Sequence, residues 1–127
     1  MRKFFVFVIL VVLAGVGLKD FIRSGECDAV LDRLKPSISA PIEYYWGVLL
    51  EMANRDQSAL YRFGRVREKY EKTPYAPLAW AEQIEILDDK GDRNGVMEEG
   101  KQFLAAYPDH PRAEIIRRKL VVIENGY

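Results

Sequence analysis

Apolar residues downstream of residue 20 recur at intervals of three and four, which is the spacing of amphipathic helices. In the segment 58–72, for example, Ala59, Phe63, Val66 and Tyr70 fall on one helical face. No stretch of the chain shows the alternation of apolar and polar residues that a half-buried strand requires. The pattern therefore predicts an all-α protein.

Proline, glycine and asparagine mark the ends of these helical segments. The predicted helices span residues 26–34, 41–52, 58–72, 77–87, 94–106 and 114–124, with connectors at 35–40, 73–76 and 107–111. Pro41 and Pro77 stand where a helix is expected to begin, because the first N–H groups of a helix have no partner within it. Gly91 follows the fourth helix as a C-terminal cap.

A shift of 37 residues superimposes one half of the helical region on the other. Residues of the same kind then coincide: Tyr70 with Tyr107, Pro74 with Pro111, Ala76 with Ala113, Val66 with Phe103, and the turn residues Asn54 and Gly91. The shift predicts a partial repeat at 24–39, repeats at 40–76 and 77–113, and a final helix at 114–125. A helical hairpin leaves one face apolar, so we expect these units to stack.

The first 23 residues have a different pattern. Arg2 and Lys3 precede an apolar run without charge, residues 4–18. One interpretation is a cleaved signal peptide, with 15–17 as the cleavage site. The other, which we favour, is an uncleaved membrane anchor in contact with the lipid bilayer, although fifteen helical residues span only about 22 Å of a core of about 30 Å. Lys19 narrows that gap by extending its charged end towards the membrane surface.

Both interpretations predict the same topology. Positive charges before the run place the N-terminus in the cytoplasm and the rest of the chain outside it. In a bacterium the helical domain would then lie in the periplasm, either held at the inner membrane or released after cleavage.

Charge and cysteine content exclude further classes. The chain has 19 basic and 19 acidic residues, of which three basic ones precede position 20, so residues 20–127 carry a net charge of 16 − 19, or −3. Nucleic-acid binding needs a basic surface and is not expected. Cys27 is the only cysteine, and the residues before it, 24–26, do not form an apolar lipidation signal. We expect it to pack within a helix, with a disulfide between chains as the alternative.

Both predicted hairpins carry the signature residues of a known repeat. Counted from Ala40, its small, small and aromatic positions are Gly47, Ala59 and Phe63; counted from Pro77, its Trp, turn-Gly and terminal Pro positions are Trp80, Gly91 and Pro108. In these residues the chain resembles the tetratricopeptide repeat, with three more linker residues per unit. The segment 103–113, FLAAYPDHPRA, is similar to stretches of bacterial envelope repeat proteins. These include the outer-membrane assembly lipoproteins, the Tol–Pal cell-division coordinator and the inner-membrane translocon-associated repeat protein.

The resemblance implies an α-solenoid of stacked helix–turn–helix units that binds other proteins. The chain departs from the repeat at Glu43, which stands where the first unit should have tryptophan, and at Val96 and Gly100, which replace alanine and an aromatic residue. Glycine costs up to about 1 kcal/mol within a helix relative to alanine. We therefore expect Gly100 to mark a close helix crossing.

In such repeats the first helix of each pair lines a concave groove, which implies the residues that face a partner. They are Tyr44, Val48, Glu51 and Met52 from the first unit, and Leu78, Ala81, Glu85, Asp88 and Asp89 from the second. This surface is apolar at one end and acidic at the other, so we expect a basic, amphipathic or extended partner segment. A solvated helix face is the alternative for the carboxylates, which include Glu82. We expect most aromatic residues in the core, with Tyr44 and Tyr75 as exposed anchors for the partner.

The final helix carries more apolar residues than one packed stripe requires. Ile115 and Val122 are left facing outwards, with Arg118 between them. Either this helix continues the groove or, as we favour, it docks on another subunit through Ile115, Arg118 and Val122.

No residues converge on a catalytic or cofactor site. His110 is the only histidine and is expected in an exposed loop, and no cysteine pair exists to complete a metal site with it. The segment 91–95 lacks the strand and the Lys-Ser/Thr pair of a phosphate-binding loop. We therefore expect no enzyme, metal, cofactor or small-molecule substrate. The predicted function is a membrane-anchored periplasmic interaction module, serving as adaptor or accessory subunit of an envelope complex; the alternative is a soluble, client-binding periplasmic module released by signal cleavage.

Overall fold

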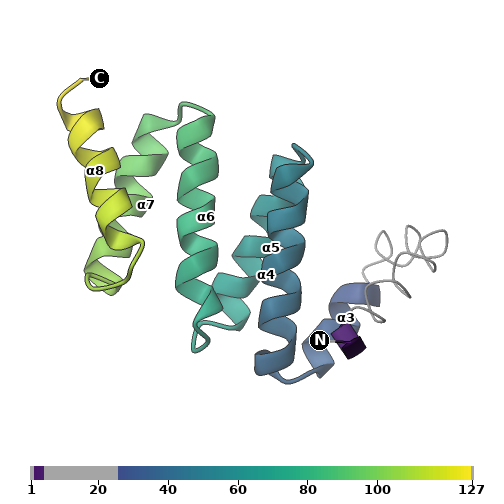
Figure 1. Ribbon diagram of the computed structural model, residues 1–127. Coiled ribbons are helices and arrows are strands. Elements are labelled where there is room, and N and C mark those ends of the chain that lie inside the picture. The colour runs from purple at the N-terminus through teal and green to yellow at the C-terminus, as the bar shows by residue number, and fades with distance from the viewer. Residues whose placement is uncertain (1, 5–25, 127) are drawn as a thin grey trace. The chain divides into compact units, whose positions relative to one another are not determined.

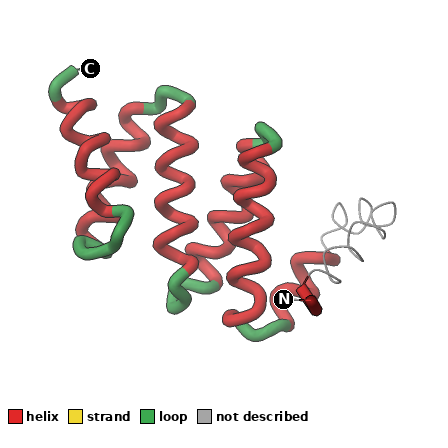
Figure 2. Tube along the Cα trace, viewed as in Figure 1, coloured by secondary structure: helices red, strands yellow, loops and turns green. Residues whose placement is uncertain are grey.

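The computed structural model describes residues 2–4 and 26–126 of the chain. Within these ranges the chain consists of helices and short loops with no strand, which confirms the prediction of an all-α protein (Figure 2). The predicted anchor or signal segment, 1–23, lies outside the described residues except for 2–4. None of the helices in the described ranges is long and apolar enough to cross a membrane.

The chain divides into two compact units, Met1–Lys35 and Pro36–Tyr127. The first contains α3 (Glu26–Arg33). The second contains α4 (Pro36–Met52), α5 (Asp56–Lys69), α6 (Tyr75–Asp89), α7 (Arg93–Ala106) and α8 (Ala113–Glu124). In the second unit each helix packs against the next, and α4 also contacts α6 (Figure 1). The result is a row of helices in which consecutive ones run in opposite directions.

The α4–α5 and α6–α7 turns have the same backbone geometry, 37 residues apart. Asn54 has a φ of 59° and donates its N–H to the Glu51 carbonyl at 3.0 Å. Gly91 has a φ of 74° and donates its N–H to the Asp88 carbonyl, also at 3.0 Å. Positive φ is accessible to glycine and tolerated by asparagine, which explains why these two residue types occupy the position.

The α5–α6 and α7–α8 connectors also share their hydrogen bonds. Tyr70 and Tyr107 donate their N–H groups to the carbonyls of Val66 and Phe103, at 3.1 and 2.7 Å. The N–H groups of Thr73 and His110 donate in turn to the carbonyls of Tyr70 and Tyr107. Each partner in the second connector lies 37 residues after its counterpart in the first.

Two hydrophobic clusters form the core of the second unit, and α6 contributes to both. The first cluster joins α4, α5 and α6 and includes Ala79 and Ile86 of α6. The second joins α6, α7 and α8 and includes Ala81 and Ile84 of α6. Helix α6 is therefore buried on two sides.

Two glycines allow close helix approach. A Cβ on Gly47 would lie 2.6 Å from a ring carbon of Phe63, so α4 leaves room there for an aromatic side chain of α5. A Cβ on Gly100 would lie 2.9 Å from a Leu120 methyl carbon. The expected close crossing at Gly100 is thus confirmed, and it is the contact between α7 and α8.

Helix α4 begins at Pro36 rather than at Pro41, so the predicted connector at 35–40 is wrong. Pro41 lies inside the helix, where proline removes one backbone hydrogen bond and costs about 3 kcal/mol. Ser39 and Ala40, just before it, have no exposed surface, so tertiary packing outweighs the local penalty. Pro77 lies within the first turn of α6, where its missing N–H would have had no helical partner.

A buried ion pair joins α4 to α5. Glu43 has no exposed surface and accepts hydrogen bonds from Arg62, at 3.1 Å, and from Arg65. The Arg62 guanidinium also lies 3.7 Å from the centre of the Trp46 ring. Burial, and then the Glu43 carboxylate, raise the pKa of the Tyr70 hydroxyl to about 12. That hydroxyl is buried and has no hydrogen-bond partner among the described residues. Glu43, which stands where the resemblance implies tryptophan, is thus buried together with two arginines.

Replacing Gly47 with alanine should destabilise the fold by about 1–3 kcal/mol, because the new methyl group overlaps the Phe63 ring. The matched control is Gly64→Ala in α5, whose Cβ would meet only the Gln83 amide nitrogen, at 3.5 Å. This control should gain up to about 1 kcal/mol from helix propensity. Urea unfolding followed by circular dichroism measures both, and equal effects of the two variants would contradict the proposed contact.

Replacing Glu43 with glutamine should cost about 3 kcal/mol of unfolding free energy, because two arginines then lose their buried counter-charge. The same change at Glu114, whose ion pair with Arg117 is exposed, should cost less than about 0.5 kcal/mol. The difference in urea midpoint between the two variants is the measurement. A small effect at Glu43 would mean that water reaches the pair.

Candidate functional site

Five carboxylates on α4 and α6 are here named the acidic cluster: Glu51 from α4, and Glu82, Glu85, Asp88 and Asp89 from α6. Burial, and then the neighbouring Glu82 carboxylate, raise the pKa of Glu51 to about 7. Asp89 and Glu85 add to the effect. Glu51 therefore interacts electrostatically with three carboxylates of α6.

The apolar residues predicted for the groove differ in exposure. Val48 and Leu78 are half-buried and pack against the first hydrophobic cluster. Met52 is 76% exposed. Ala81 is buried within the second cluster and faces no partner. The side chains of Glu85 and Asp88 are 43% and 38% exposed.

Tyr44 is not the exposed anchor that was predicted. Only 5% of it is exposed, because its ring packs against the rings of Phe63 and Tyr75, at 5.9 and 5.6 Å between centroids. Its hydroxyl donates to a Glu82 oxygen at 3.4 Å. Tyr75, the second predicted anchor, is half-buried in the same group. Tyr45, the next residue along α4, is the aromatic side chain that reaches the surface there, at 54% exposure.

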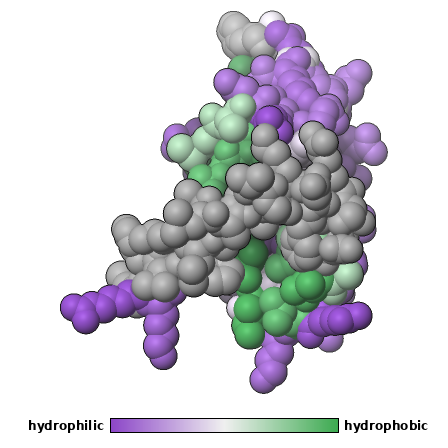
Figure 3. Space-filling view, turned by 90° about the vertical axis from the view of Figure 1, so that its right-hand side faces the viewer, coloured by the Kyte–Doolittle hydropathy of each residue, from purple (hydrophilic) through white to green (hydrophobic). Residues whose placement is uncertain are grey.

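Apolar side chains of α4 are exposed beyond the predicted groove. They are Ile38, Tyr45 and Leu49, between 47% and 64% exposed. Figure 3 shows hydrophobic side chains at the surface among hydrophilic ones. Neither Ile38 nor Leu49 belongs to the predicted groove.

Two cations, Arg112 at the α8 N-cap and Lys119 in α8, pair with the acidic cluster. Arg112 donates to Glu82 at 2.8 Å. The Lys119 ammonium lies 3.0 Å from Glu85 and 2.6 Å from Asp88. Five carboxylates against two cations leave a net charge of −3 when all are ionised.

Sequence reasoning missed these pairings, although a signal for them exists. Arg112 and Lys119 are seven residues apart and so lie on one helical face. Their partners Glu82, Glu85 and Asp88 follow one another at intervals of three on α6. Matching the two patterns would have predicted that α8 lies against the acidic face of α6.

The three residues predicted for a subunit interface, Ile115, Arg118 and Val122, line one open cleft of about 480 Å³. Asp88 at the end of α6 and Arg93 at the start of α7 line it as well. Helix α8 packs on α7 through Ile116 and Leu120, which leaves Ile115 and Val122 52% and 47% exposed. The structure therefore places the end of the acidic cluster and the predicted interface at the same cleft.

His110 is half-buried rather than freely exposed in its loop. Its Nδ1 accepts a hydrogen bond from the Arg112 N–H at 3.1 Å, and its ring packs edge-on against Phe103. Burial, and then the charge of Arg112, lower the pKa of His110. The histidine thus shapes the turn before α8.

The part of the chain that the structure describes holds no group of three His, Cys, Asp or Glu side chains able to bind a metal ion. Cys27, in α3, is half-buried and forms no disulfide within the described ranges. Comparison of the chain with protein-family models, with curated proteins and with solved structures gives no match.

The raised pKa of Glu51 predicts how the stability of the fold depends on pH. A carboxyl whose folded pKa of about 7 lies above its ordinary value of about 4.5 stabilises the fold below pH 4.5, and that contribution is lost as the pH rises through 7. Glu51→Gln keeps the neutral form at every pH. Its urea midpoint should therefore match the wild type at pH 4 and exceed it at pH 8.

The control is Glu98→Gln, which removes an exposed carboxylate from α7. Its midpoint difference from the wild type should be the same at both pH values. If Glu51→Gln behaves in the same way, the acidic cluster does not act on Glu51.

Proposed function

We propose that the second unit is a stack of tetratricopeptide-like hairpins that binds a basic segment of a partner protein in the groove of α4 and α6. The N-terminal segment tethers it to a membrane, where it serves as adaptor or accessory subunit of an envelope complex. The single observation that carries the proposal is the acidic cluster, which concentrates net negative charge beside the exposed Met52 and the half-buried Val48 and Leu78.

The recurrence of turn hydrogen bonds at 37 residues supports the repeat part of the proposal. The position of α6 supports it as well. This helix packs against α4 and α5 in one cluster and against α7 and α8 in the other, as a middle helix of a stack does. Stacked helical hairpins present one long surface built from their first helices, and recognition of extended or helical segments is their common use.

Charge supports the choice of partner. Lysine or arginine side chains of a bound segment would offset the negative charge around Glu51 and Asp89. Association should then be fast and dependent on salt, because complementary charge steers encounter. The proposal assigns no catalytic role to the cluster.

The tether rests on the sequence of residues 2–18, with two basic residues before the apolar run. The proposal places the N-terminus in the cytoplasm and the helical units in the bacterial periplasm. Release by signal cleavage, which would give a soluble client-binding module, is the competing arrangement.

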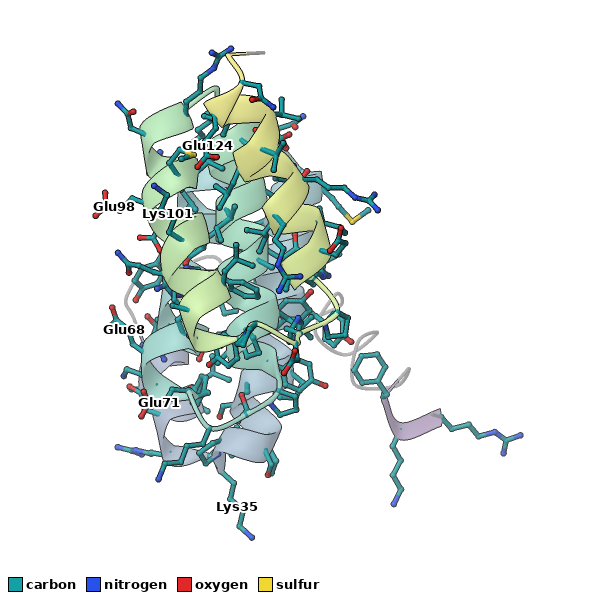
Figure 4. The ribbon with its side chains drawn as sticks, turned by 90° about the vertical axis from the view of Figure 1, so that its left-hand side faces the viewer. Lys35, Glu68, Glu71, Glu98, Lys101 and Glu124 are labelled. Atoms are coloured by element: carbon teal, nitrogen blue, oxygen red, sulfur yellow. The ribbon has the colours of Figure 1, made fainter. Side chains whose placement is uncertain are left out.

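Binding of fluorescent basic amphipathic peptides to the full chain in mild detergent tests the groove. The double change Glu51→Lys and Asp89→Lys should weaken binding at least tenfold, since it replaces two attractions with two repulsions. The control is the double change Glu68→Lys and Glu98→Lys, which alters the net charge equally on α5 and α7. Figure 4 shows Glu68, Glu71 and Glu98 pointing away from the helices.

Equal loss of binding in the two double variants would mean that only overall charge attracts the peptide, and the groove proposal would then fail. Loss in the groove variant alone, with helicity unchanged, supports it.

A further inference from the structure

The cleft beside α8 has a chemical character opposite to that of the acidic cluster. It lies where the end of α6, the α6–α7 turn and α8 meet, and its volume is about 480 Å³. Clefts of roughly 300–1,000 Å³ are the size of typical ligand sites in proteins. A smaller cavity of about 50 Å³ between α6 and α8 shares Ile115 and Lys119 with it.

The apolar part of the cleft comes from one face of α8. Ile115 and Val122 are about half exposed, and Ile123 completes this surface. In α6, the residues 37 positions earlier are Leu78 and Glu85, of which Leu78 packs into the first hydrophobic cluster. Ile115 has no comparable cover, so an apolar surface is available at the end of the stack.

The charged part of the cleft is cationic. Arg93, Arg118 and Lys119 line it against one carboxylate, Asp88, which gives a net charge of +2. Asp88 already accepts the Lys119 ammonium at 2.6 Å, so these two charges offset each other. Arg118 is 77% exposed and pairs only distantly with Glu114, at 3.5 Å, and Arg93 is exposed. Two guanidinium groups therefore remain to receive carboxylates.

We propose that this cleft binds an acidic amphipathic segment of a partner protein. Its apolar side chains would lie on Ile115 and Val122, and its carboxylates would pair with Arg93 and Arg118. Guanidinium groups suit this role because they bind carboxylates through two parallel hydrogen bonds. The site extends the proposed function with a second, oppositely charged contact, and it does not depend on the acidic groove.

The cleft would also determine the direction in which a partner segment binds. From the C-terminal ends of α4 and α6 to the start of α7 and to α8, the charge changes from acidic at Glu51 and Asp89 to basic at Arg93 and Arg118. A partner that used both regions would carry its basic residues towards α4 and its acidic residues towards α8. Reversal of such a segment would set like charges against each other at both ends.

A random peptide library displayed on phage, selected on the full chain, tests the proposal without assuming a partner sequence. Peptides that also bind the Arg93→Glu, Arg118→Glu double variant are removed first. The remaining sequences should combine aspartate or glutamate with leucine, isoleucine, valine or phenylalanine. Sequences without carboxylates, or no sequence that depends on the cleft, would overturn the proposal.

Selected peptides are then titrated by fluorescence anisotropy. Val122→Asp and the double arginine variant should each weaken binding at least tenfold, and higher salt should weaken wild-type binding. The control Lys101→Glu inverts an exposed charge on α7, outside the cleft, and should keep the wild-type affinity. Unchanged circular dichroism shows that each variant is folded.

The two proposed sites are distinguished by testing the variants of each site with the peptides that bind the other. The Glu51→Lys, Asp89→Lys protein should keep its affinity for acidic peptides, and the cleft variants should keep theirs for basic peptides. If only the first result holds, the cleft proposal stands and the groove proposal fails. Two other occupants would overturn the cleft proposal: a second copy, shown by a dimer that Val122→Asp dissociates, and vesicles of anionic lipid that bind through the cleft when peptides do not.

Discussion

Helix α6 packs in both hydrophobic clusters at once, and the arrangement of the second unit depends on that double packing. Ala79 and Ile86 face one cluster, and Ala81 and Ile84 face the other. Small residues beside larger ones let neighbouring helices pack closely on both sides of α6. The four carboxylates of α6 are half-buried or exposed, so they lie on the surface that the two clusters leave uncovered. The closeness of charges in the acidic cluster is thus a result of how the helix is packed.

Those features of the fold that depend on nearby residues could be predicted from the sequence. Helix content, the turn positions at Asn54 and Gly91 and the close crossing at Gly100 each follow from residues that act over a few positions or through their size. The 37-residue spacing recurs in the turn hydrogen bonds because turn geometry depends on short local segments. The predicted start of α4 at Pro41 was wrong, because the burial of Ser39 and Ala40 outweighs the cost of a proline inside the helix.

The candidate site was less predictable, because its properties come from contacts between distant residues. Glu43 was visible as a departure from the repeat, but its partners Arg62 and Arg65 lie on another helix. Tyr44 was placed on the correct helix, yet its burial depends on Tyr75 and Glu82, more than thirty positions away. The carboxylates of α6 were identified, whereas their pairing with Arg112 and Lys119 needed the docking of α8. Of these contacts, only the spacing of the charged residues on α6 and α8 leaves a signal in the sequence.

The two hydrophobic clusters have no residue in common, which affects when different parts of the second unit open. Helices α7 and α8 contribute to only one of the clusters, so they can separate from α6 while α4 and α5 stay packed. Opening at that end breaks the Lys119 and Arg112 pairs and removes one wall of the cleft, but it leaves the Phe63 cluster intact. The two halves of the second unit would therefore exchange their amide hydrogens at different rates and have different lifetimes.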